Sequence, residues 1–327
     1  MAANKAAQSG VAGVDEPLGQ TPLRRYWRPR HWPYWLFWLW MRITAALPFR
    51  WALGLHKAIG RLVYRLGTKR AFVVRRNLEV CFPELSAAEI EMLVRLQFES
   101  IGASVAETAI AWCAPQRKFA GRFAISGLEH LERGLEKGRG VILFTGHFTT
   151  LEICGRAFKE FTPLFTYMYT PRRDRLLDEI QYRGRSRSAH ESILSSDVRA
   201  MLRSLRKNAV VWYAPDEVYL GSNGRLVDFF GEPAMTNVAT PKLARLSGAT
   251  VLAYFCRRLP GDSSYELRFV PVEGMPSNDP VADTRRLIEM LEAYIRLCPE
   301  QYLWLHKRFR SRPPGYPDLY ERRDEGG

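Results

Sequence analysis

The sequence lacks the motifs of several common enzyme chemistries. It contains no Gly-rich phosphate-binding loop, no Cys and His spacing typical of a zinc site and no Gly-x-Ser-x-Gly segment. These absences argue against nucleotide-driven chemistry and against a serine hydrolase. The five Cys residues form no Cys-x-x-Cys pair, so we expect buried or free thiols in a reducing compartment. Cys154 lies near the site described below, but nothing in the sequence activates it as a nucleophile.

Acidic residues are scarce relative to basic ones. The 327 residues include 34 Asp and Glu against 48 Lys and Arg, which gives a formal net charge of +14. This excess indicates a polyanionic partner, namely an anionic membrane, an acidic carrier protein, a phosphorylated substrate or a nucleic acid. Trp residues gather early in the chain, which favours a membrane interface over a nucleic acid. They are Trp27, Trp32, Trp35, Trp38, Trp40 and Trp51.

The sequence also lacks an uninterrupted hydrophobic run of the length that crosses a bilayer. We expect residues 1–31 to be a disordered basic tail and residues 32–55 to be a membrane anchor. A spanning helix needs about 20 apolar residues, whereas Arg42, Pro48 and Arg50 interrupt this segment. The anchor is therefore either a single imperfect span or an interfacial helix with an aromatic belt. A Trp-rich docking helix of a soluble protein is the alternative.

The remainder divides into two parts by its periodicity. Residues 56–120 are expected to form a helical layer, in which Ser86 and Glu89 have the spacing of a capping box. From 121 to 320, short apolar segments alternate with helical ones, which predicts an α/β core. The expected strands are residues 141–144, 164–169, 210–213, 250–256 and 265–272, and the expected helices include 151–160, 175–187, 197–207 and 236–247.

The candidate catalytic residues follow the first strong strand of this core. Residues 141–144 are a continuous apolar run, and Gly146 permits a sharp turn before a helix that begins near Thr150. His147 would lie in the loop and Glu152 on the first helical turns, so the carboxylate can reach one imidazole nitrogen. The other nitrogen can then take a proton from a hydroxyl. The alternative is a loop histidine of no catalytic importance beside an exposed helix charge.

Three further segments carry candidate functional groups. Arginines are dense from 172 to 187, where they can bind phosphate or carboxylate oxygens or simply form a solvated helix face. The expected strand 210–213 leads to Pro215 and Asp216. Residues 299–309 are rich in aromatic and basic side chains.

Taken together, these segments resemble the lipid A lauroyl/myristoyl acyltransferase family of the lysophospholipid acyltransferase superfamily. The resemblance runs from residues 28–32 through 75–84 to 299–309, and its core is the His-x4-acid motif at His147 and Glu152. It implies that His147 is a general base and that Glu152 orients it. It also implies that Arg185, with Arg187 beside it, and Asp216 bind substrate. The chain departs from the usual Pro-Asp-x-Asp-x-Gly, since Val218 replaces the second acid.

The resemblance further implies a fold and an activity. The fold is a mixed sheet flanked by helices, with an N-terminal membrane-anchoring helix. The activity is transfer of a fatty acyl chain from acyl carrier protein to a hydroxyl of the Kdo-bearing tetraacylated lipid A precursor. The hydroxyl attacks the thioester directly, so we expect no metal and no cofactor.

The expected location is the cytoplasmic face of the inner membrane, among its lipids, with no nucleic-acid partner. Two alternatives stay open. One is the same chemistry on another glycolipid or glycerolipid acceptor, and the other is a non-catalytic basic protein that binds membranes or nucleic acid.

Overall fold

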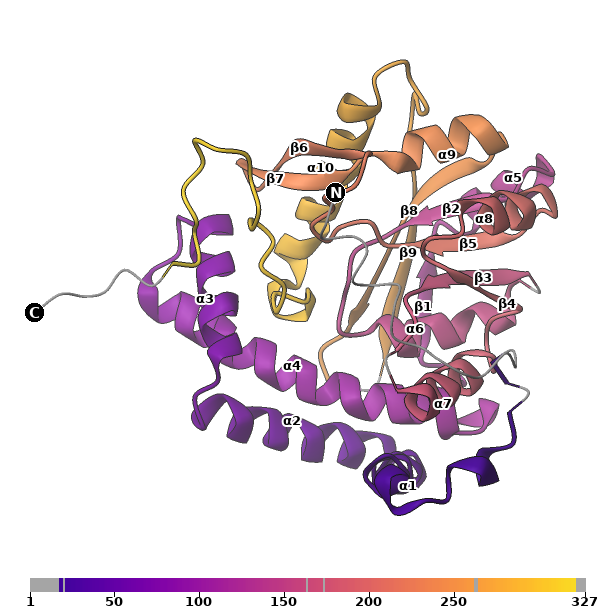
Figure 1. The fold of residues 1–327 in the computed structure, drawn as a ribbon, viewed down its shortest axis with the longest axis vertical. Helices are drawn as coiled ribbons and strands as arrows, with labels where there is room; N and C mark the ends of the chain where they lie inside the picture. The colour runs from indigo at the N-terminus through magenta and orange to yellow at the C-terminus, as the bar shows by residue number, and fades with distance from the viewer. Residues whose placement is uncertain (1–17, 20, 163, 173, 262–263, 322–327) are drawn as a thin grey trace, which may run out of the picture.

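The computed structural model describes residues 18–19, 21–162, 164–172, 174–261 and 264–321 (Figure 1). Residues 1–17 and 20 of the expected tail lie outside this set. The described part of that tail differs from the expectation, because it forms two 3-10 turns, η1 (Leu23–Tyr26) and η2 (Pro29–His31). Tyr26 is buried against Leu176 and Ile180, and this apolar contact explains why the segment is folded.

Within the described residues, seven strands form one sheet in the order β1-β9-β8-β2-β5-β3-β4, and two more form a hairpin. Neighbouring strands of the sheet are parallel except β8 and β9, so the predicted mixed sheet is confirmed. The strands of the sheet are β1 (Phe123–Ser126), β2 (Val141–Phe144), β3 (Phe165–Tyr169), β4 (Glu191–Leu194), β5 (Val210–Tyr213), β8 (Thr250–Arg258) and β9 (Tyr265–Pro271). The hairpin is β6 (Gly224–Phe229) with β7 (Glu232–Asn237).

Helices flank the sheet, as expected, and α1 to α4 lie together beside it (Figure 1). Helices α5 and α8 pack on the strands, and α10 packs on β8 and the hairpin. Ser86 and Glu89 make the predicted capping box at the start of α4. The helices are α1 (Trp32–Ala46), α2 (Phe49–Arg65), α3 (Lys69–Cys81), α4 (Ala87–Cys113), α5 (Leu128–Glu136), α6 (Leu151–Ala157), α7 (Arg175–Arg185), α8 (Val198–Arg206), α9 (Ala239–Ser247) and α10 (Pro280–Leu297).

Two glycines allow α2 and α4 to run side by side in close contact (Figure 1). A Cβ on Gly60 would lie 2.1 Å from the carbonyl oxygen of Phe98, and a Cβ on Gly102 would lie 2.1 Å from that of His56. The obstructing atoms are backbone, which cannot rotate away as a side chain can. The N-terminal helices are therefore fixed directly to α4, the helix that also contacts α6 and α7 beside the candidate site.

The expected anchor segment consists of α1 and the first part of α2, separated by Leu47 and Pro48. No helix in the part of the chain that the structure describes is long and apolar enough to cross a bilayer. The two helices nevertheless leave many large apolar side chains exposed, which we call the α1–α2 apolar face. It comprises Trp32, Leu36, Phe37, Leu39, Trp40, Ile43, Trp51, Leu55, Ile59, Leu62 and Val63.

Candidate active site

The loop that follows β2 carries His147 and is held at both sides. Strand β2 is wholly buried between β5 and β8, so its carboxyl end is fixed within the sheet. The amide of Leu303 donates to the carbonyl of His147 at 2.8 Å, and the amide of Thr149 donates to the carbonyl of Gln301 at 2.8 Å. The histidine thus lies in the loop between strand and helix, as predicted.

Asp216, at the end of the neighbouring strand β5, is the partner of His147. The Nδ1 atom of His147 lies 2.6 Å from Oδ1 of Asp216, and the His147 amide donates to Oδ2 at 2.9 Å. The hydroxyl of Tyr302 also donates to Oδ2, at 2.8 Å. The Asp216 side chain is only 2% exposed, whereas that of His147 is 32% exposed. Nδ1 is therefore occupied, and Nε2 is the ring nitrogen left for a substrate.

This pairing perturbs both groups. Burial lowers the pKa of His147, but the adjacent Asp216 carboxylate outweighs it, with a smaller contribution from Glu217, and raises that pKa from 6.5 to about 9. The charge of Arg185 opposes this rise. Burial raises the pKa of Asp216, but the charge and hydrogen bonds of His147 dominate and lower it to about 2. Asp216 is therefore ionised at neutral pH and stabilises the protonated imidazole.

Glu152 does not occupy the place expected for it, and the predicted contact with the imidazole is wrong. Its Oε1 atom accepts from Arg185, with Nε at 2.9 Å, and its Oε2 atom accepts from Trp112 Nε1 at 2.8 Å. The guanidinium of Arg185 also lies 4.9 Å from the centre of the Tyr167 ring. The acid of the His-x4-acid motif thus anchors Arg185, because α6 turns Glu152 toward α4 and α7. The catalytic role of Glu152 stays a prediction.

Asp216 and Arg187, which were both predicted to bind substrate, make contacts within the protein. Asp216 was predicted to bind substrate, but its carboxylate is buried and its oxygens are engaged by His147 and Tyr302. Arg187 lies where α7 and α4 end, and it donates to the carbonyl of Ala114 at 2.9 Å. This bond ties the two helix ends together. Binding of substrate by Arg187 stays a prediction.

Sequence reasoning missed two side chains at the free nitrogen of the base. Oε1 of Glu217 lies 3.8 Å from Nε2 of His147, and the same oxygen lies 2.9 Å from Nε2 of His306. Tyr302 and His306 both belong to the aromatic and basic segment 299–309, to which the sequence assigns no specific role. The only signal for Glu217 was its place directly after Asp216.

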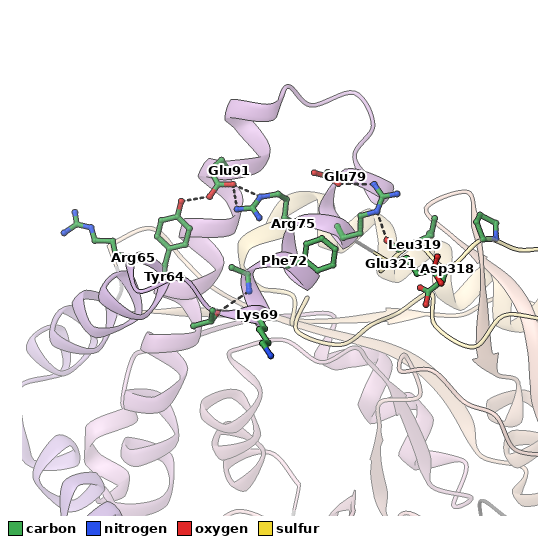
Figure 2. A pocket seen from close by; sticks show the side chains of 15 residues that line it. Tyr64, Arg65, Lys69, Phe72, Arg75, Glu79, Glu91, Asp318, Leu319 and Glu321 are labelled. Atoms are coloured by element: carbon green, nitrogen blue, oxygen red, sulfur yellow. Dashed lines mark hydrogen bonds and ion pairs between the residues drawn. The ribbon is translucent and has the colours of Figure 1, made fainter. Parts of the chain in front are cut away.

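A surface groove of about 1280 Å³ lies elsewhere, between the end of α2, α3 and residues 317–321 (Figure 2). Two ion pairs lie in its lining, Arg75 with Glu91 and Arg76 with Glu79. None of the predicted site residues lines it. Across the described residues, no three His, Cys, Asp or Glu side chains are grouped to hold a metal ion.

A histidine with one nitrogen on a buried carboxylate and the other open to substrate is suited to deprotonating a hydroxyl. Comparison with known proteins identifies the class of enzyme to which this chain belongs. Residues 22–311 match the sequence profile of the bacterial lipid A biosynthesis acyltransferases. The chain therefore belongs to that family and is an acyltransferase.

Its relatives include three enzymes of Escherichia coli strain K12. The chain is 37% identical to the lipid A biosynthesis lauroyltransferase over 294 residues, which cover 88% of this chain and 95% of the relative. It is 35% identical to the palmitoleoyltransferase over 91% of this chain and 97% of the relative. It is 25% identical to the myristoyltransferase over 90% of this chain and 92% of the relative. The similarity thus extends over nearly the whole length of each enzyme.

Proposed function

We propose that this enzyme transfers a fatty acyl chain from acyl carrier protein to a hydroxyl of the Kdo-bearing tetraacylated lipid A precursor. The observation that carries the proposal is the His147–Asp216 pair at the carboxyl ends of β2 and β5. Family membership supports lipid A as the acceptor. The large positive charge suits two acidic substrates, a phosphorylated sugar lipid and an acidic carrier protein.

The reaction uses His147 first as a base and then as an acid. Nε2 removes the proton from the lipid hydroxyl while Asp216 holds the Nδ1 proton and stabilises the imidazolium that forms. The hydroxyl oxygen bonds to the thioester carbonyl carbon, and the carbon–sulfur bond then breaks. The imidazolium returns its proton to the departing thiolate, so the enzyme ends in its starting state and carries no acyl group.

Arg185 supplies positive charge near this chemistry. It lies within electrostatic reach of His147, and Glu152 and the Tyr167 ring fix its orientation. Negative charge develops on the carbonyl oxygen during attack and requires a preorganised partner. In this proposal Arg185 stabilises that charge or the anionic groups of the substrates, and Glu152 is its positioning residue.

The enzyme works at the cytoplasmic face of the inner membrane, and the α1–α2 apolar face rests in the bilayer interface. Trp51 is 73% exposed on this face and Leu66, at the end of α2, is 74% exposed. The sequence has no Asp or Glu from residue 17 to residue 78, although Arg and Lys are frequent there. Apolar side chains surrounded by basic residues alone are typical of helices that lie on anionic lipid surfaces.

The proposal is tested by incubating the purified enzyme with dodecanoyl-acyl carrier protein and the tetraacylated precursor, and separately with a lysophospholipid and with a glycolipid lacking Kdo. We expect the precursor alone to gain the mass of one acyl chain. A gain on the lysophospholipid or the other glycolipid instead would keep the acyltransferase chemistry and reject lipid A as the acceptor. Binding of the lipids without any mass gain would contradict the catalytic role.

A further inference from the structure

A cavity of about 180 Å³ lies between α1, α4 and α7, apart from the His147 loop. Its walls are largely apolar and come from four segments of the chain: Leu23 of η1, Trp38 and Met41 of α1, Trp112 and Cys113 of α4, and Ile180 of α7. Helix α1 also carries the α1–α2 apolar face. The cavity is therefore lined in part by a helix that faces the proposed membrane surface.

Three arginines contribute to the walls, and their charged ends are held by neighbouring groups. The guanidinium of Arg42 lies 5.2 Å from the centre of the Trp38 ring, and Arg187 donates to the carbonyl of Ala114. Arg183 donates to Glu179 and to the carbonyl of Thr21. With their heads engaged in this way, the arginine side chains present their aliphatic stems as apolar surface. The cavity therefore favours an apolar guest.

Trp112 connects this cavity directly to the active site. Its ring lines the cavity, while its Nε1 atom donates to Oε2 of Glu152, which in turn holds Arg185. A Cβ on Gly184 would lie 2.4 Å from Cγ of Trp112, so only glycine lets the indole lie this close to α7. Trp112 thus belongs to the wall of the cavity and also contacts the Glu152–Arg185 pair directly.

We propose that this cavity receives the end segment of a fatty acyl chain of a substrate. An apolar cavity of ~150 Å³ can hold a benzene ring, so this one accommodates a segment of roughly six carbon atoms. The inference rests on the proposed function for the origin of the chain, which belongs either to the thioester donor or to the lipid acceptor. Binding of a fatty chain is itself independent of catalysis and can be measured without it.

Cys113 provides a selective reporter. The other four cysteines are buried, whereas Cys113 is partly exposed and lines the cavity. We would measure its alkylation by N-ethylmaleimide by mass spectrometry of the full-length enzyme, and the Cys113→Ser variant gives the background. Dodecanoate at ten times its dissociation constant should slow alkylation about tenfold, because only about a tenth of the sites stay empty. Butyrate, which is too short to fill the cavity, should protect far less.

The source of the chain follows from two further arms, dodecanoyl-acyl carrier protein alone and the tetraacylated precursor alone. Protection by the first assigns the cavity to the donor chain, and protection by the second assigns it to the acceptor. Alkylation that proceeds equally fast with dodecanoate, donor and acceptor would overturn the proposal. Acyl transfer with an unprotected Cys113 would reject this cavity but keep the proposed function. Protection of Cys113 without acyl transfer would support this cavity but reject the proposed function.

A variant that fills the cavity provides an independent readout. Each methylene buried in an apolar site strengthens binding about fourfold, so kcat/KM should rise with chain length while carbons enter the cavity. Cys113→Phe should flatten this dependence for the longest chains and affect the shortest little, which a general loss of folding would not do. Met92→Phe, at an exposed position of the same helix, is the control and should keep the wild-type profile. An unchanged profile in a folded Cys113→Phe enzyme would contradict the proposal.

Discussion

Asp216 determines how His147 behaves at a given pH. Because the carboxylate raises the pKa of His147 to about 9, the imidazole is mostly protonated in the free enzyme at neutral pH. A general base must be neutral, so kcat/KM should increase with pH by about tenfold per unit and level off above about pH 9. The pH dependence of kcat/KM measured with saturating donor checks this expectation. A profile that is flat between pH 6 and 9 would contradict the assignment of His147.

Asp216→Asn removes the charge and leaves a side chain of the same shape. The inflection of the profile should fall toward or below 6.5, because burial then acts on His147 without the opposing carboxylate. The maximal rate should also fall, by up to about 10⁴-fold as in other His–Asp pairs, because the imidazole loses its fixed tautomer. Measuring both the inflection and the maximal rate separates a loss of His147 orientation and charge from simple unfolding. Unfolding would lower the rate without moving the inflection.

Glu217 allows a milder test of the same electrostatics. Its carboxylate lies 3.8 Å from Nε2 of His147 and contributes to the raised pKa. Glu217→Gln should therefore move the inflection of the kcat/KM profile to lower pH and increase activity near neutral pH. The shift should be less than about one pH unit, since partly exposed charge pairs are worth about 0.2–1 kcal/mol. Glu129→Gln on α5 is a suitable control, and an equal shift there would refute the local explanation.

The sequence indicated His147 and Arg185 as candidate site residues but did not indicate which side chains they contact. The His-x4-acid spacing suggested that Glu152 would hold the imidazole, since both belong to one local segment. In the structure the partner is Asp216, 69 positions away in the sequence. Its position follows from the pairing of β2 with β5, a feature of sheet order that no local pattern contains. The same holds for Tyr302 and His306, which reach the site from the C-terminal segment.

At the scale of elements, the close contact of α2 with α4 depends on glycine. Gly102→Ala would place a Cβ 2.1 Å from the carbonyl oxygen of His56, so the helices must separate. We expect a loss of roughly 1–3 kcal/mol in the free energy of unfolding, measured by chemical denaturation. Gly54→Ala in α2 is the matched control, since nothing lies within 4 Å of its added Cβ. That variant should be stabilised by about 0.5–1 kcal/mol, and equal effects at the two positions would contradict the packing account.

The central strands were predictable and the edge strands were not. The apolar runs at β2 and β5 match the predicted residues, because a strand buried on both faces must be apolar throughout. Strands β1 and β4 were missed, since they lie at the edges of the sheet and are mostly exposed. The hairpin β6–β7 was also missed. Its strands mix apolar, polar and charged residues and show no long apolar run.

At the scale of the whole molecule, the α1–α2 apolar face predicts binding to lipid surfaces. The purified enzyme should sediment with vesicles that contain anionic phospholipid, bind neutral vesicles more weakly and release partly at high salt. Replacing Trp51 and Leu62 by Ser should weaken binding to both kinds of vesicle, because less apolar area enters the interface. Replacing Leu220 and Leu246, two exposed residues outside α1 and α2, should change nothing. Equal effects from both pairs would contradict the assignment of this face.

The most direct test of the account is acyl transfer by the wild-type enzyme and by His147→Ala, measured as the mass of the tetraacylated precursor after incubation with acyl carrier protein thioesters. The wild-type enzyme should add one acyl chain. The variant should be slower by about 10²- to 10⁴-fold, because it lacks the base that deprotonates the hydroxyl. Full activity in a folded His147→Ala enzyme would show that the His147–Asp216 pair is not the catalytic centre.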